Sequence, residues 1–279
     1  MTQREKTFNR VGFIGLLILA ILWLVPLALI LMNSFKSNLF ISQTPFAFPN
    51  ADTFTAEENY TSGLERTGFF TAAGLSLFIT IFSVAVIILV TSMTAWYIAR
   101  VKAWYTSVLY YLFVFSMIVP FQMVMFTMSK VANVTHLDNP VGIIVLYAGF
   151  GAGLSVFIFV GFIRSIPIEI EEAAMIDGAS PFKVFFTVIF PIIRPTAVTI
   201  AILNAMWIWN DYLLPYLVIG SEYQTIPIAV RQYMVGSYGQ KDMGGFMAML
   251  VVAIIPIIVF FLSCQKYIIK GVAAGAVKG

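Results

Sequence analysis

The sequence predicts an all-α integral membrane protein with six transmembrane helices. Hydrophobic residues make up 60% of the 279 residues and charged residues only 10%, whereas a soluble domain carries about 25% charged residues. The chain therefore cannot cover itself with a water-compatible surface. Crossing the hydrocarbon core takes about 20 mostly apolar residues, and six stretches are long enough. These spans lie roughly at residues 11–32, 69–96, 104–128, 141–163, 196–218 and 246–267, within what we expect to be one transmembrane domain covering residues 1–279.

The placement of lysine and arginine predicts the orientation of the spans, because basic residues favour cytoplasmic connections. One side of the predicted topology carries eleven of them: Arg4, Lys6, Arg10, Arg100, Lys102, Arg164, Lys183, Arg194, Lys266, Lys270 and Lys278. The other side carries five: Lys36, Arg66, Lys130, Arg231 and Lys241. The richer side holds both ends of the chain and the connection between spans four and five. We therefore expect both termini and that connection to be cytoplasmic.

The connection between spans four and five, residues 164–195, carries the start and stop signals of a short helix. Ser165 can cap a helix that has Pro167 in its first turn, and the glutamates that follow complement the positive end of that helix. Asp177 and Gly178 predict its end, because glycine takes the left-handed closing conformation at little cost.

A second start signal follows directly. Ser180 and Pro181 repeat the cap and the proline, and Pro191 with Pro195 is expected to turn the chain into span five. An acidic first helix would be repelled by an anionic leaflet, so these two helices are not expected to rest on the membrane. The pattern predicts a rigid knob that docks onto a cytoplasmic partner protein.

Several kinds of site are absent from the sequence. No lysine, arginine, aspartate or glutamate lies well inside a span, Asp211 being near an interface, so no carrier of a coupling proton or ion is evident. The sequence has no G-x-x-x-x-G-K-[ST] phosphate loop, and its single cysteine excludes an internal disulfide and a multi-cysteine metal site. We expect no catalytic, cofactor-binding or metal-binding residues in this chain. Energy for uphill transport would have to come from another protein.

Two groups of residues inside the spans each have two interpretations. A proline usually kinks a membrane helix, so Pro120 and Gln122 in span three either line a transport pathway or mark a packing kink. The second group, in span five, consists of Asn204, Trp209, Asn210 and Asp211. These residues either gate the pathway and contact substrate, or anchor the span at the outer interface, where aromatic residues collect.

The connection at residues 164–195 resembles the EAA loop of ABC importer permeases. It has Glu172-Ala173-Ala174, then Gly178, then a hydrophobic-x-hydrophobic-Pro pattern ending at Pro191. Val188 and Phe190 replace the isoleucine and leucine of that pattern but remain apolar. Other motifs are similar to the shorter, six-span subunit of maltose-type carbohydrate importers: Asn33-Ser34-Phe35-Lys36, Pro120-Phe121-Gln122, Trp209-Asn210 and Gly275-Ala276-Val277-Lys278-Gly279.

The resemblance implies a permease subunit of an ATP-driven carbohydrate importer in the plasma membrane of a prokaryote. Its partners would be a second permease subunit in a heterodimer, two ATP-binding subunits that carry ATP and Mg, an extracytoplasmic sugar-binding protein and membrane lipid, with no nucleic acid. The residues implied to contact the ATP-binding subunits are Glu171, Glu172, Ala173, Ala174, Asp177, Gly178 and Ala179. The tail, with Gly275 and Lys278, either reaches the same subunits or is a disordered end.

Two other classes of protein are alternatives to this one. An autonomous channel or secondary carrier would transport without an ATPase. A membrane-embedded enzyme or sensor would need a reactive group of residues facing a cavity, and the sequence has none. The substrate cannot be identified from the sequence, because aromatic and amide residues that suit sugars occur throughout the spans.

Overall fold

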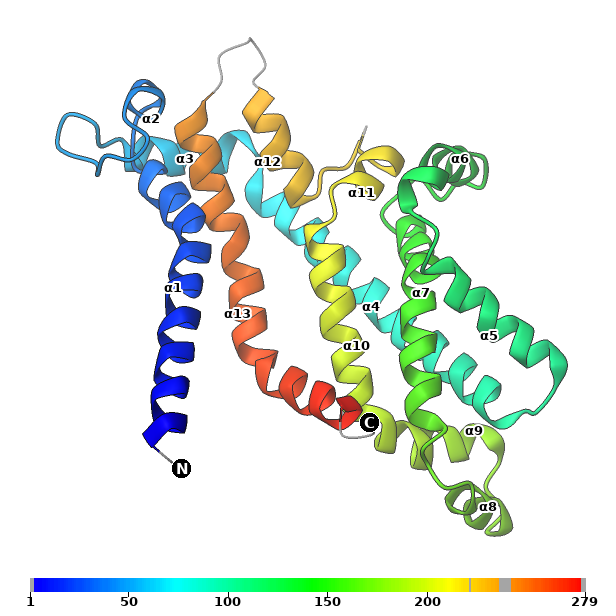
Figure 1. Cartoon of the computed structure of the whole chain (residues 1–279). Coiled ribbons are helices and arrows are strands. Elements are labelled where there is room, and N and C mark those ends of the chain that lie inside the picture. Colours follow the sequence, from blue (N-terminus) through cyan, green and yellow to red (C-terminus); the bar gives the residue numbers. More distant parts are fainter. Residues whose placement is uncertain (1–2, 221, 236–241, 277–279) are drawn as a thin grey trace. The chain divides into compact units, whose positions relative to one another are not determined.

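The computed structural model is helical throughout its regular elements and describes residues 3–220, 222–235 and 242–276 (Figure 1). This confirms the predicted all-α class. The chain divides into two compact units, one of residues 1–70 and 229–256 and the other of residues 71–228 and 257–279.

The first unit is built on long apolar helices. It contains α1 (Gln3–Asn33), α2 (Asn38–Gln43), α3 (Ala56–Arg66), most of α12 (Ile226–Val235) and the first part of α13 (Met243–Ala276). The large apolar side chains of α1 between Phe13 and Leu31 are exposed along the helix. A helix that is apolar on all sides is stable when lipid or another helix covers it.

Between α1 and α3 the chain folds into a small packed segment around Lys36. The Lys36 side chain is buried, its Nζ donates to the carbonyl of Thr44 at 2.9 Å, and burial lowers its pKa from the ordinary value. The buried Asn59 amide of α3 donates to the carbonyls of Ser34 and Lys36, each at 2.9 Å. Phe35 and Phe54 stack at 6.1 Å between ring centroids. This segment therefore has its own core and its own satisfied backbone groups.

Replacing Asn59 by alanine tests this segment. Asn59→Ala leaves two buried carbonyls without a donor, and an unsatisfied buried acceptor costs about 1–3 kcal/mol. We expect a lower apparent melting temperature in detergent, measured by intrinsic fluorescence. Glu58→Ala removes an exposed side chain from the same helix and should leave the melting temperature unchanged. Equal melting temperatures for the two variants would contradict the role given to Asn59.

The second unit holds the remaining helices. They are α4 (Phe69–Arg100), α5 (Trp104–Ser116), α6 (Phe121–Val134), α7 (Gly142–Ile163), α8 (Glu169–Ile176), α9 (Pro181–Val184), the π-helical turn η1 (Phe185–Ile189), α10 (Phe190–Asn210) and α11 (Leu213–Val218). Within this unit, α8 and α9 lie at one end of the long helices, and α6 and α11 lie at the other (Figure 1). A buried apolar cluster joins α4, α7 and α10 near the α8 end; its members include Ala95, Phe159, Ile163, Phe185 and Ile193.

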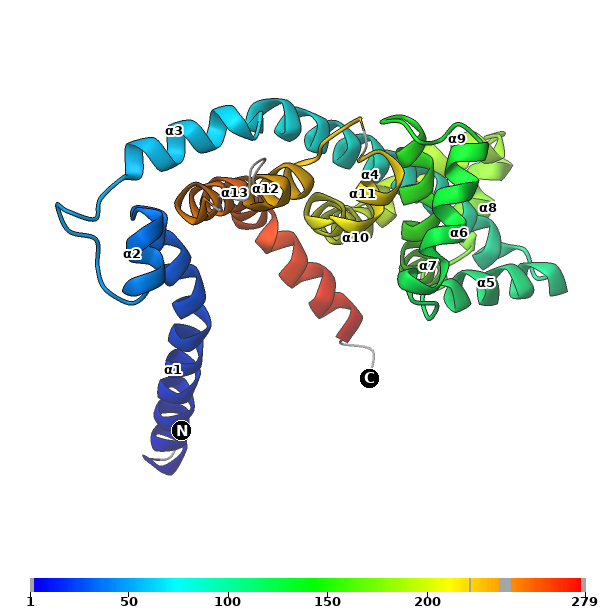
Figure 2. The same cartoon turned by 90° about the horizontal axis from the view of Figure 1, so that it is seen from above.

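Among the described residues, five helices are long and apolar enough to cross a membrane, and the number becomes six if α5 and α6 count as one broken span. These two helices meet at an angle of 105°, and Figure 2 shows α5 and α6 running in different directions. The bend expected at Pro120 in the span at residues 104–128 is therefore confirmed, but it is a full break between two helices rather than a kink within one. Pro120 caps α6 in an extended conformation. Proline cannot donate a helical hydrogen bond and disfavours helical backbone in the residue before it, so the helix breaks here.

Candidate functional site: the α8 knob

The predicted docking element is a helix–corner–helix formed by α8, residues 177–180 and α9. The backbone of Gly178 has φ +82°, the left-handed conformation that ends α8. The Ser180 hydroxyl accepts a hydrogen bond from the Lys183 backbone at 3.4 Å and so caps α9. The helix stop at Asp177-Gly178 and the helix start at Ser180-Pro181 are both where the sequence predicted them.

Two other local predictions are wrong. Ser165 does not cap a helix: its hydroxyl donates back to the Phe162 carbonyl at 2.7 Å, and α8 begins later, at Glu169. Pro191 and Pro195 do not end a separate surface helix, because one helical run continues from Pro181 to Asn210. The π-helical turn η1 ends at Ile189, two residues before Pro191. Local π adjustments of this kind re-satisfy the backbone groups that a proline frees in a membrane helix.

Glu171 fastens α8 to the end of α4. Its carboxylate forms an ion pair with the Arg100 guanidinium at 2.7 Å and accepts a hydrogen bond from Trp96 Nε1 at 2.9 Å. Arg100 also donates to the Ile166 carbonyl at 3.0 Å, just before α8. The Glu171 side chain is only 3% exposed. Glu171 is therefore an internal anchor, whereas the resemblance implied that it contacts an ATP-binding subunit.

The opposite side of α8 is open. Among the seven residues predicted to form the docking surface, Glu172, Ala173, Asp177 and Gly178 are exposed, and Ala174 and Ala179 are half-buried. The same helix end exposes Met175 and, at 85% exposure, Ile176. Exposed apolar side chains beside carboxylates, on a short helix outside the candidate spans, make this side of α8 a candidate protein contact surface.

A packed apolar base connects this surface to the long helices. Phe185, at the turn after α9, is fully buried and lies 5.6 Å from Trp96 of α4 between ring centroids. Val184 and Ile189 are also fully buried in the cluster that joins α4, α7 and α10. Interiors packed in this way have low compressibility and transmit displacement. A force applied to α8 therefore reaches three long helices.

Three residues of the predicted pathway group are held inside the second unit. The Asn204 amide is buried and donates to Ser155 Oγ of α7 at 3.3 Å and to the Ile200 carbonyl at 2.9 Å. Trp209 is buried near the end of α10. Asp211 accepts hydrogen bonds from the Leu213 backbone at 2.9 Å and from the Tyr147 hydroxyl at 3.1 Å. These contacts join α7, α10 and α11.

The other predicted residues lie elsewhere. Pro120, Gln122 and Asn210 are exposed in the isolated chain, and the Asn210 amide donates to the Met206 carbonyl at 2.7 Å. They are not brought together with Asn204 by any hydrogen bond among the described residues. Of the tail residues, Gly275 falls within α13, and Lys278 lies outside the described residues.

Trp96, Arg100 and Tyr147 are contacts that sequence reasoning missed. From the sequence, Arg100 is identified only as one of the basic residues that predict the orientation. Arg100 lies at the predicted cytoplasmic end of span two, and the next predicted cytoplasmic connection contains an acidic helix. This opposite charge on the same side of the membrane is the sequence signal for an ion pair. The choice of Glu171 as the partner of Arg100, rather than Glu169 or Glu172, depends on how α8 is rotated about its axis. Three neighbouring glutamates in a sequence do not reveal that rotation.

With this geometry in view, comparison with known proteins defines the class. The family of binding-protein-dependent transport system inner membrane components matches residues 87–274. The chain belongs to this family. It is therefore a permease subunit of an ABC importer, a multi-pass protein of the cytoplasmic membrane without a catalytic role of its own, as expected from the sequence.

Individual relatives match over nearly their whole length. The chain is 36% identical over 269 residues to AmyC of Thermoanaerobacterium thermosulfurigenes, a probable starch degradation products transport system permease protein, with 95% of each chain covered. It is 34% identical to the multiple sugar-binding transport system permease protein MsmG of Streptococcus mutans, with 100% of each covered. It is 32% identical to the melibiose/raffinose/stachyose import permease protein MelC of Bacillus subtilis, with 91% of each covered.

Solved structures support the fold. A chain of a bacterial ABC transporter involved in the import of the acidic polysaccharide alginate superposes with a TM-score of 0.80 at 23% identity, covering 96% of this chain and 98% of that one. A second structure is the alginate ABC transporter in complex with an alginate pentasaccharide-bound periplasmic protein. It has a TM-score of 0.57 at 14% identity, with 96% and 95% covered.

The corner of the α8 knob can be tested at Gly178. No atom lies within 4 Å of a Cβ placed there, so only the backbone conformation opposes a side chain. The left-handed conformation costs a non-glycine residue roughly 1–2 kcal/mol, and asparagine less than alanine. We expect the wild type to have the highest melting temperature, Gly178→Asn a lower one and Gly178→Ala the lowest. An alanine variant as stable as the wild type would show that the corner does not need glycine.

The anchor can be tested by a double-mutant cycle between Arg100 and Glu171. Removing one partner of a buried ion pair destabilises by roughly 3–5 kcal/mol, and residues in contact are strongly non-additive. We expect Arg100→Ala and Glu171→Ala each to lower the melting temperature by several degrees, and the double variant to lower it little further. Glu169→Ala, an exposed glutamate of the same helix, is the matched control and should have almost no effect. Additive losses would contradict the ion pair.

Proposed function

We propose that this chain is the permease subunit of a carbohydrate importer and that its α8 knob is the coupling element for cytoplasmic ATP-binding subunits. In this proposal both termini and α8 are cytoplasmic. A second permease subunit completes the translocation pathway, two ATP-binding subunits hold ATP and Mg, and an extracytoplasmic binding protein delivers the sugar. The family description, with its dependence on a binding protein, supports this assembly.

The arrangement of α8 carries the proposal. One side of the helix is fastened through Glu171 to Arg100, and the other side exposes Glu172 beside Met175 and Ile176. A carboxylate next to apolar side chains fits a cleft that offers a basic residue within an apolar wall. A helix that is free on one side and anchored on the other converts movement of its partner into movement of the span to which it is anchored.

The packing of the second unit suggests how that movement continues. When the ATP-binding subunits close, α8 would be displaced and would take the end of α4 with it through the Arg100 ion pair. The buried Phe185 and Ile189 would carry the same displacement into α7 and α10. The hydrogen bond of Asn204 to Ser155 keeps α10 and α7 moving together. Such rigid-body movement alternates access to a site between two subunits.

The choice of a carbohydrate rests on the relatives. AmyC, MsmG and MelC carry names that refer to starch degradation products, to multiple sugars and to melibiose, raffinose and stachyose. Sharing 32–36% identity with all three over nearly the full length favours an oligosaccharide or related sugar. The second permease subunit can contribute most of the sugar contacts.

Reversing the charge of Glu172 tests the coupling. In proteoliposomes that contain the complete importer, we expect Glu172→Lys to reduce sugar uptake at least tenfold and to abolish stimulation of ATP hydrolysis by the loaded binding protein. The reason is that a positively charged ammonium group would replace the carboxylate and would repel the basic residue that the proposal places opposite it. The measurements are radiolabelled uptake and phosphate release.

Glu58→Lys provides the control, since it makes the same charge reversal at an exposed position of α3, which the proposal places outside the cell. It should leave uptake unchanged. Normal uptake by Glu172→Lys would refute α8 as the coupling element. Uptake by the purified chain alone, without ATP-binding subunits, would favour the competing assignment as a channel or secondary carrier.

A further inference from the structure

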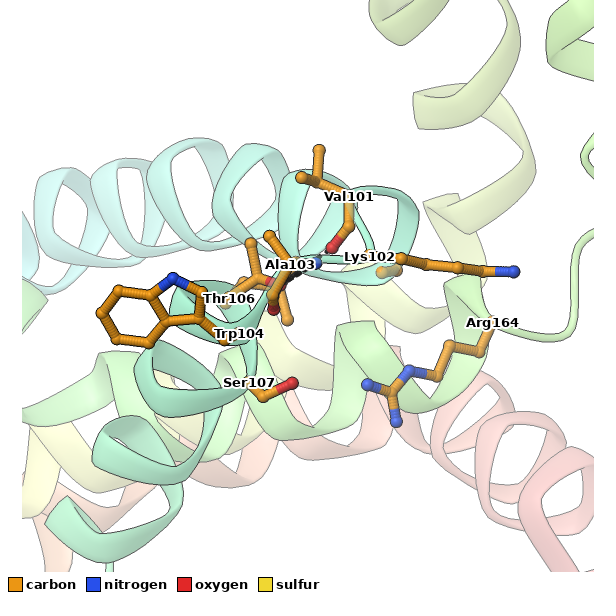
Figure 3. A pocket seen from close by; sticks show the side chains of 9 residues that line it. Val101, Lys102, Ala103, Trp104, Thr106, Ser107 and Arg164 are labelled. Atoms are coloured by element: carbon orange, nitrogen blue, oxygen red, sulfur yellow. Dashed lines mark hydrogen bonds between the residues drawn. The ribbon is translucent and has the colours of Figure 1, made fainter.

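A cleft at the α8 end of the second unit is not used by the proposed transport function. It has a volume of about 520 Å³ and is lined by the end of α4, the connection 101–103, the start of α5 and Arg164 after α7 (Figure 3). Pockets for small ligands have volumes of about 300–1,000 Å³. The cleft is therefore large enough for a lipid headgroup.

Two basic side chains line this cleft, Lys102 and Arg164. Neither forms an ion pair with another residue in the parts of the chain that the structure describes. The Arg164 guanidinium lies over the ring of Tyr110, 5.3 Å from its centroid. This contact holds the guanidinium in place without neutralising its charge. Figure 3 shows the Arg164 side chain extending toward the side of the cleft where Ser107 lies.

Hydroxyl groups complete the polar part of the cleft and fix its shape. Thr106 is buried, and its hydroxyl bonds with the carbonyls of Val101 and Ala103 at 2.8 and 2.7 Å, which holds the connection between α4 and α5 in one conformation. Ser107 is exposed and lines the cleft. Two cations and a hydroxyl donor are groups that bind a phosphate.

An apolar stripe runs from the cleft along α5. Trp104 is 80% exposed and lies across the cleft from Lys102 and Arg164 (Figure 3). Further exposed apolar or aromatic residues follow at spacings of three and four along the helix: Tyr105, Val108, Leu112 and Phe115. This spacing places them on one face. A phosphate group beside an apolar track, with a tryptophan at the junction, matches a phospholipid better than a soluble phosphate compound.

We propose that this cleft binds the headgroup of an anionic phospholipid, with an acyl chain along the exposed face of α5. The proposal rests on the proposed orientation, which places Lys102 and Arg164 at the cytoplasmic leaflet, where anionic lipids collect. The bound lipid holds the connection 101–103, which directly follows Arg100, the anchor of α8. Lipid composition therefore acts on the same helix end that couples to the ATP-binding subunits.

The test measures lipid binding to the full-length chain in detergent by native mass spectrometry. Phosphatidylglycerol, phosphatidylcholine with the same acyl chains, and glycerol 3-phosphate are titrated separately. We expect one phosphatidylglycerol to bind at least tenfold more tightly than phosphatidylcholine. Lys102→Gln with Arg164→Gln should weaken binding of phosphatidylglycerol about 30-fold, the effect of two basic residues near a membrane surface, and should leave phosphatidylcholine unchanged.

The matched control is Lys183→Gln with Arg194→Gln, which removes two exposed basic residues of the same unit away from the cleft. It should bind phosphatidylglycerol like the wild type. Should the double variant at the cleft fail to fold, Arg164→Lys keeps the charge and should retain binding, while Arg164→Gln should lose about fivefold. The assay contains no ATP-binding subunit and no sugar, so its outcome is independent of whether the chain couples to an ATPase.

Four results would overturn the proposal. They are equal affinity for the two lipids, unchanged binding by the variant at the cleft, equal losses in the variant and its control, and binding of glycerol 3-phosphate as tightly as of phosphatidylglycerol. The last result would define a site for small anions.

Discussion

The ion pair between Arg100 and Glu171 is the contact on which the arrangement of the α8 end depends. Removing two charges from water is costly unless further hydrogen bonds satisfy them. Trp96 and the Ile166 carbonyl supply these bonds. Because Trp96 also packs on Phe185, the polar anchor and the apolar base share one side chain. The anchor and the base therefore hold α8 as one unit, and its rotation is determined by which glutamate points inward.

Because Glu171 points inward, the glutamates of α8 have two different roles: one anchors the helix and another is exposed. A run of three nearby glutamates looks uniform in sequence, yet Glu171 is buried and Glu172, its neighbour, is exposed. Adjacent residues on a helix point about 100° apart, so anchoring one presents the other to a partner. The anchor is thus also what orients the surface that the ATP-binding subunits are proposed to contact.

Local signals in the sequence predicted local structure correctly where a few neighbouring residues determine it. They did not predict features that depend on the surrounding helices. The apolar stretches predicted the helical class, and Gly178 and Ser180 predicted a corner and a cap, because each depends on a few neighbouring residues. Ser165 was expected to cap a helix, but its hydroxyl bonds backward to Phe162. Pro191 was expected to turn the chain into span five, but the helix continues through it after a π-helical turn. Asn204 stays a candidate for the pathway, and its hydrogen bond to Ser155 of α7, which the sequence does not reveal, also makes it a link between helices.

The break at Pro120 has a consequence for what surrounds α5. A 13-residue helix is about 20 Å long at 1.5 Å per residue, whereas the hydrocarbon core is about 30 Å thick. A span that starts at Trp104 therefore loses its regular hydrogen bonding before it has crossed the bilayer. Backbone groups freed at that depth cannot face lipid and are tolerated only against protein or a water-filled space. Residues 117–120 thus require a covering of protein or water beyond α5 and α6, and the proposed second permease subunit is one protein that would provide it.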